Sequence, residues 1–90
     1  FEKPDTATFP LLGLAYKAIS IGGTMPAVLN GANEAAVLLF LEHKIDFLDI
    51  PQLIEQTMNG HNTVYDPSLD EILTADLLAR NDVNQYRKGW

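Results

Sequence analysis

The spacing of apolar residues predicts four helices, over about 9–21, 25–42, 50–58 and 69–80. Their expected core faces are Leu11, Leu12, Ala15, Ala18 and Ile19 in the first, Val28, Ala32, Ala35, Ala36 and Leu39 in the second, Ile50, Leu53, Ile54 and Met58 in the third, and Leu69, Ile72, Leu73 and Leu77 in the fourth. The segment 25–42 is the most apolar, and its small residues, with Gly31 beside them, would let another helix approach closely. The pattern therefore predicts an all-α, four-helix bundle-like domain with 25–42 at its centre.

Capping motifs support these helix starts. Thr8, Thr24 and Asp49 each stand two residues before a proline, where a side-chain oxygen can accept a hydrogen bond from a first-turn N–H group. Asp49 also has a glutamine three residues on, and Ser68 begins a full S-x-x-E capping box. The glycine pair 22–23 is expected to end the first helix, because glycine accepts the left-handed conformation of a C-terminal cap.

Five polar residues stand out on the predicted helices. Asn30, Asn33 and Glu34 lie opposite the core face of the second helix, and Asp76 and Arg80 have the i,i+4 spacing of an ion pair. They could bind a small ligand or form a docking contact. Polar groups on an otherwise apolar helix more often satisfy neighbouring segments, however. We therefore predict that the five residues form a structural seam, inside the bundle or against another domain.

The residues contain no recognisable catalytic, cofactor-binding or metal motif. The glycine pair follows a helix and lacks the spacing of a dinucleotide fingerprint. There is no cysteine, and neither His43 nor His61 stands in the Glu-x-x-His arrangement of a metal-binding bundle. The prediction is that no residue here is catalytic, cofactor-binding or metal-ligating, with a metal-binding bundle as a less favoured alternative.

Composition narrows the possible partners. Of the 90 residues 47% are hydrophobic, and the formal net charge of −6 argues against a nucleic-acid partner, which would require a basic face. The longest apolar run, 35–41, is far short of a membrane span. The chain starts without an initiator methionine, so we expect it to be a piece of a longer protein, with 1–8 as a linker and 81–90 as a weakly periodic tail prone to fraying.

Several of these pieces together resemble the C-terminal domain of the 1-deoxy-D-xylulose 5-phosphate reductoisomerase family. The matching residues are Phe9-Pro10, Leu14-Ala15, the Gly-Gly turn, Pro26, Leu29-Asn30, Ala32-Asn33-Glu34, Ala36-Val37, the apolar pattern from Phe40 to Ile50, and PSLDEILTADLLAR near the end. The resemblance covers about residues 1–80. Members commonly carry alanine where Gly31 stands and valine where Ala35 stands, which are changes of packing rather than of chemistry.

The resemblance implies a function that the residues alone do not indicate. The family's enzyme isomerises and reduces 1-deoxy-D-xylulose 5-phosphate to 2-C-methyl-D-erythritol 4-phosphate in non-mevalonate isoprenoid biosynthesis. It uses NADPH and a divalent cation, Mg²⁺ or Mn²⁺, and is expected to be a homodimer. The location implied is the bacterial cytoplasm, with a plastid-type compartment as the alternative.

The resemblance also implies that the functional residues lie elsewhere. None of the family's catalytic, metal or NADPH residues falls on a position of this chain, so the isolated 90 residues are expected to be inactive. Their expected partners are the cofactor and catalytic domains of the same enzyme, which the helical domain would brace. The alternative is a free-standing helical interaction module with an acidic surface.

Overall fold

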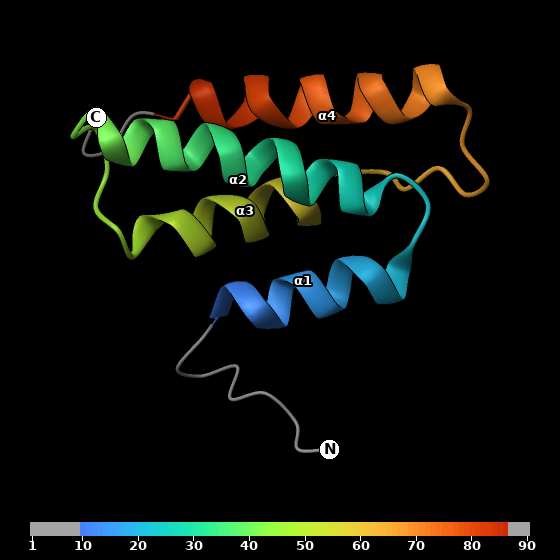
Figure 1. Cartoon of the computed structure of the whole chain (residues 1–90), viewed down its shortest axis with the longest axis horizontal. Helices are drawn as coiled ribbons and strands as arrows, with labels where there is room; N and C mark the ends of the chain where they lie inside the picture. The colour runs from blue at the N-terminus through green and yellow to red at the C-terminus, as the bar shows by residue number, and fades with distance from the viewer. Residues whose placement is uncertain (1–9, 87–90) are drawn as a thin grey trace.

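The computed structural model describes residues 10–86, which form an all-α fold (Figure 1). Its helices are α1 (Pro10–Ile21), α2 (Met25–Leu41), α3 (Asp49–Asn59) and α4 (Leu69–Asn84). The predicted fold class and the four helices are thereby confirmed. No helix within residues 10–86 is both long enough and apolar enough to cross a membrane.

Helix α2 is the centre of the fold and packs against all three other helices. Its predicted core face is confirmed, since all five residues of that face are almost completely buried. In Figure 1, α1 and α4 lie on opposite sides of α2 and α3. The molecule is a thin slab, with principal extents of 37 × 35 × 18 Å, so its helices have fewer neighbours than in a rounder bundle.

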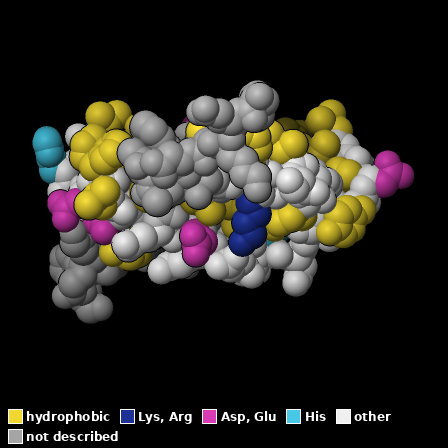
Figure 2. Space-filling view, turned by 90° about the horizontal axis from the view of Figure 1, so that it is seen from below, with side chains coloured by type: hydrophobic (Ala, Val, Ile, Leu, Met, Phe, Trp, Pro, Cys, Tyr) yellow, Lys and Arg dark blue, Asp and Glu magenta, His cyan; other side chains and the backbone are white. Residues whose placement is uncertain are grey.

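The core faces of α1 and α4 differ from those predicted. In α1, Leu14 and Ala18 are buried, whereas Leu12 and Ile19 are exposed. Looking onto the α1 side, Figure 2 shows hydrophobic side chains spread over the described part of the surface. In α4 the predicted residues are all on the outside, and the buried residues are Ala75, Ala79 and Val83.

The tail is also shorter than predicted. Helix α4 does not end near Arg80 but continues to Asn84, and Val83 within this extension is only 1% exposed. A buried apolar side chain stabilises the last turn of a helix that would otherwise fray. Residues 1–9 and 87–90, which include Thr8, the whole of the expected linker and the end of the tail, lie outside the described part of the structure.

One helix start and one helix end behave as the sequence predicts. The Ser68 side chain accepts a hydrogen bond from the Glu71 N–H group, and the Glu71 carboxylate accepts one from the Ser68 N–H group, which completes the capping box. At the end of α1, Gly22 and Gly23 have φ angles of +74° and +56°. A Cβ atom on Gly23 would lie 2.3 Å from the Val64 carbonyl oxygen, so this turn requires glycine for space as well as conformation.

Two predicted caps are wrong. Thr24 has helical backbone angles, and its side chain makes no capping hydrogen bond. Its hydroxyl contacts the loop at residues 61–64 instead. Helix α3 begins at Asp49 itself, one residue earlier than predicted, so that Leu48 and not Asp49 is the N-cap. The Asp49 carboxylate instead accepts a hydrogen bond from the Asp46 N–H group.

Candidate functional site

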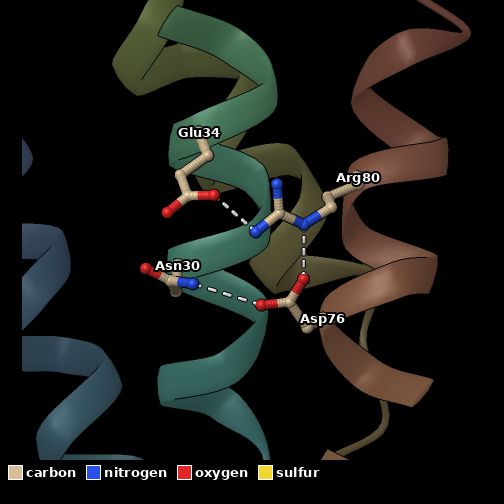
Figure 3. A network of polar contacts seen from close by, with 4 residues as sticks. All are labelled: Asn30, Glu34, Asp76 and Arg80. Atoms are coloured by element: carbon tan, nitrogen blue, oxygen red, sulfur yellow. Dashed lines mark hydrogen bonds and ion pairs between the residues drawn. The ribbon is translucent and has the colours of Figure 1, made fainter. Parts of the chain in front are cut away.

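Four of the five predicted seam residues meet between α2 and α4 (Figure 3). Asn30 and Glu34 are one turn apart on α2, and Asp76 and Arg80 are one turn apart on α4. Their side chains point toward one another across the gap between the two helices. Asn33 is half-buried and is not part of these contacts.

A continuous set of polar contacts joins the four residues, which we call the seam network. The Asn30 amide donates to Asp76 Oδ2 at 3.1 Å. Arg80 donates through Nε to Asp76 Oδ1 and through Nη2 to Glu34 Oε2. The i,i+4 ion pair predicted between Asp76 and Arg80 is therefore present, and the same guanidinium also links α4 to α2.

The two helices can come this close because Gly31 lies at their crossing. A Cβ atom built on Gly31 would lie 2.5 Å from the backbone oxygen of Asp76, so even alanine there would require α4 to shift. This confirms the prediction that Gly31 allows close packing. The approach of the two backbones brings Asn30 and Glu34 within hydrogen-bond reach of α4.

The seam network favours the charged forms of Asp76 and Arg80. The hydrogen bond from Arg80 lowers the pKa of Asp76 below the ordinary value of 3.8, against an opposing effect of desolvation and with a further contribution from Asn30. Hydrogen bonds to Asp76 and then Glu34 raise the pKa of Arg80. Each contact stabilises the ionised pair, although the side chains of Glu34, Asp76 and Arg80 remain 53%, 25% and 32% exposed, so water screens them in part.

The lowered pKa of Asp76 predicts an acid-dependent stability. Because the folded state binds the proton more weakly than the unfolded state, the contribution of Asp76 is fully present above pH 3.8 and is lost as the pH falls through the lower folded pKa. We expect Asp76→Asn to be less stable than the original chain at neutral pH and the difference to shrink in acid. Urea unfolding of both proteins from pH 7 down to pH 2 would measure this, and a difference independent of pH would contradict it.

A second polar cluster, which the sequence analysis missed, fixes the loop before α4. The buried Thr24 hydroxyl lies 2.7 Å from His61 Nε2 and accepts a hydrogen bond from the Val64 N–H group at 3.0 Å. The Thr24 N–H group in turn donates to the Val64 carbonyl oxygen at 3.0 Å. These contacts join the α1–α2 turn to a loop about forty residues away, and no local motif in the sequence indicates such a pairing.

A cleft beside α4 is lined by acidic residues, and residues 10–86 hold no group of metal-ligating side chains. This cleft, of about 570 Å³, lies between α4 and the segment at residues 57–64. Asp70, Glu71 and Asp82 are among its lining residues, and no lysine or arginine is, so it would repel the phosphates of a dinucleotide. Within residues 10–86, no three histidine, aspartate or glutamate side chains lie close enough together to hold a metal ion.

Comparisons with known proteins agree on one family. The family model for the DXP reductoisomerase C-terminal domain matches residues 1–82. The 1-deoxy-D-xylulose 5-phosphate reductoisomerase of Acetivibrio thermocellus is 56% identical over 98% of this chain, and that of a Synechococcus species is 53% identical over 94%. The match covers only 23% and 22% of these relatives' own length.

A solved structure shares the fold. The 1-deoxy-D-xylulose 5-phosphate reductoisomerase from Zymomonas mobilis, in complex with NADPH, is 40% identical to this chain and superposes with a TM-score of 0.86. The superposition covers all of this chain and 24% of the Zymomonas chain. The 90 residues therefore span about a quarter of the proteins they resemble.

Proposed function

The chain belongs to the family of DXP reductoisomerase C-terminal domains, and from this premise we propose that it braces the catalytic part of such an enzyme. The whole enzyme would isomerise and reduce 1-deoxy-D-xylulose 5-phosphate to 2-C-methyl-D-erythritol 4-phosphate, a step of non-mevalonate isoprenoid biosynthesis. NADPH would supply the hydride and Mg²⁺ or Mn²⁺ would polarise the substrate oxygens. The enzyme would act as a homodimer in the bacterial cytoplasm.

The seam network is the observation that supports a bracing role over a catalytic one. Its only cation, Arg80, is shared by Asp76 and Glu34, so the site has no uncompensated positive charge for a phosphate. The pKa shifts of Asp76 and Arg80 run toward their charged forms, whereas a proton-transfer group needs a pKa near the working pH. The family match over residues 1–82 also argues against a free-standing interaction module.

The proposal predicts that the 90 residues alone bind neither NADPH nor the sugar phosphate. Isothermal titration calorimetry with NADPH, and with the substrate plus Mg²⁺, should give no saturable heat for the isolated chain. The full-length enzyme that contains this domain is the positive control and should bind both ligands and oxidise NADPH when the substrate is added. Saturable binding by the 90 residues would place part of the active site on this domain, and an inactive full-length enzyme would refute the proposed reaction.

A further inference from the structure

The Thr24 hydroxyl lies where the α1–α2 turn meets the loop that follows α3. It accepts a hydrogen bond from the Val64 N–H group and lies 2.7 Å from His61 Nε2. A hydroxyl group has only one hydrogen to donate, and within residues 10–86 His61 Nε2 is the one contact of this hydroxyl that can accept it. The hydroxyl therefore donates to Nε2, which requires His61 to be neutral and to carry its proton on Nδ1.

A proton on Nε2 would break this arrangement. An imidazolium ring donates from both nitrogens and accepts at neither. Nε2 would then direct an N–H group at the Thr24 oxygen, and the hydroxyl hydrogen would lose its acceptor. Because Thr24 is only 1% exposed, water does not replace that acceptor, and a buried polar group without a partner is costly. The contact between Thr24 and His61 is therefore complete only while His61 is uncharged.

The cleft beside α4 offers a charged ring another position. Three carboxylates of α4 line the same cleft as His61, namely those of Asp70, Glu71 and Asp82. The loop itself carries one more acidic residue, Asp66. On α1, the Lys17 ammonium group lies 3.4 Å from Asn59 Oδ1, two residues before His61. The carboxylates attract an imidazolium toward α4, so the charged ring has both a reason to leave Thr24 and a place to go.

We infer that Thr24 and His61 form an acid-sensitive latch between the α1–α2 turn and residues 61–64. While His61 is neutral, the Thr24 hydroxyl is oriented to hold the Val64 N–H group, and the Thr24 N–H group holds the Val64 carbonyl oxygen at 3.0 Å. Histidine is the side chain that commonly gains a proton just below neutral pH. Mild acid therefore opens the latch and loosens the loop, whereas the apolar core between the helices contains no histidine and stays in place.

Hydrogen exchange of the full-length enzyme tests the latch at about pH 7.5 and about pH 5, on either side of the usual histidine range. Aspartate and glutamate side chains remain mostly ionised at the lower pH. Fragmentation mass spectrometry gives the exchange rate of the Val64 amide relative to an unstructured peptide at the same pH. Its protection should fall about fivefold in acid, as expected for the loss of one net hydrogen bond. The Thr24 amide should lose protection with it, because it donates to Val64.

Two variants separate the latch from a general effect of acid. His61→Gln provides an amide oxygen that can accept from the Thr24 hydroxyl but does not titrate, so the acid response of both amides should disappear. His43→Asn removes the other histidine of the 90 residues, which is exposed and has a φ angle of +62°, a conformation that asparagine tolerates. This control should keep the acid response. Circular dichroism of each variant shows that it is folded.

Each outcome supports the latch or overturns it. Loss of Val64 protection at the lower pH in the original enzyme and in His43→Asn, without an acid response in His61→Gln, supports it. Equal protection of Val64 at both pH values in the original enzyme would overturn it. The same acid-induced loss in His61→Gln would also overturn it, because another group would then be responsible. None of these measurements depends on catalytic activity, so the proposed function is tested separately.

Discussion

Replacing Ile54 with alanine should lower the free energy of unfolding by about 2–5 kcal/mol, the range for large-to-small changes in a packed core. Ile54 lies in α3, is completely buried and is one of the largest side chains to be so. The change removes three carbon atoms from the core and leaves a cavity that the rigid helices around it can close only in part. Urea unfolding monitored by circular dichroism would measure the loss as a lower midpoint at an unchanged slope.

Glu55→Ala is the matched control, because it truncates the neighbouring residue on the exposed side of the same helix. Its effect should stay within about 0.5 kcal/mol, as is usual for surface substitutions. If the two variants unfolded at the same urea concentration, the core position of Ile54 would be wrong.

The face of α3 could be predicted from sequence because the helix has one clear apolar stripe. Ile50, Leu53, Ile54 and Met58 recur at helical spacing, and all four are at most 5% exposed in the structure. The intervening positions 52, 55 and 56 are polar and exposed, so no second face competes for burial. Where a single stripe of large apolar residues exists, the periodicity determines the orientation of the helix.

The face of α4 could not be predicted in this way because the helix carries two apolar stripes. Leu69, Leu73 and Leu77 form the larger one and remain exposed, while Ala75 and Ala79 on another side are buried. The backbone of α4 comes so close to Gly31 of α2 that only small side chains fit between the two helices. The larger side chains of the leucines led to the prediction that they would be buried. The alanines are buried instead, because the space between helices α2 and α4 admits only small side chains.

The seam could be predicted in outline but not in its pairings. The ion pair between Asp76 and Arg80 follows from local spacing and is confirmed. The contacts from Asn30 to Asp76 and from Glu34 to Arg80 each join residues 46 positions apart. These two contacts depend on which residues of α4 lie opposite Asn30 and Glu34 of α2. That alignment is determined by the close packing of α4 on Gly31, and no local sequence pattern indicates it.

Replacing Ala36 with leucine should destabilise the protein by about 1–3 kcal/mol, the usual range for overpacking a close-packed core. Ala36 is completely buried on α2, the helix that packs against all the others, and its neighbour on the same face, Ala32, is also completely buried. Three added carbon atoms would have to push α2 away from a neighbouring helix or adopt a strained rotamer.

Thermal unfolding measures the change. The control is Ser20→Leu, which places the same side chain at an exposed position of α1. A lower melting temperature for Ala36→Leu alone would show that small residues on α2 are required by the distance between the helices. An unchanged melting temperature would show that this side of α2 has room for a larger side chain, which would contradict the close packing inferred for the centre of the fold.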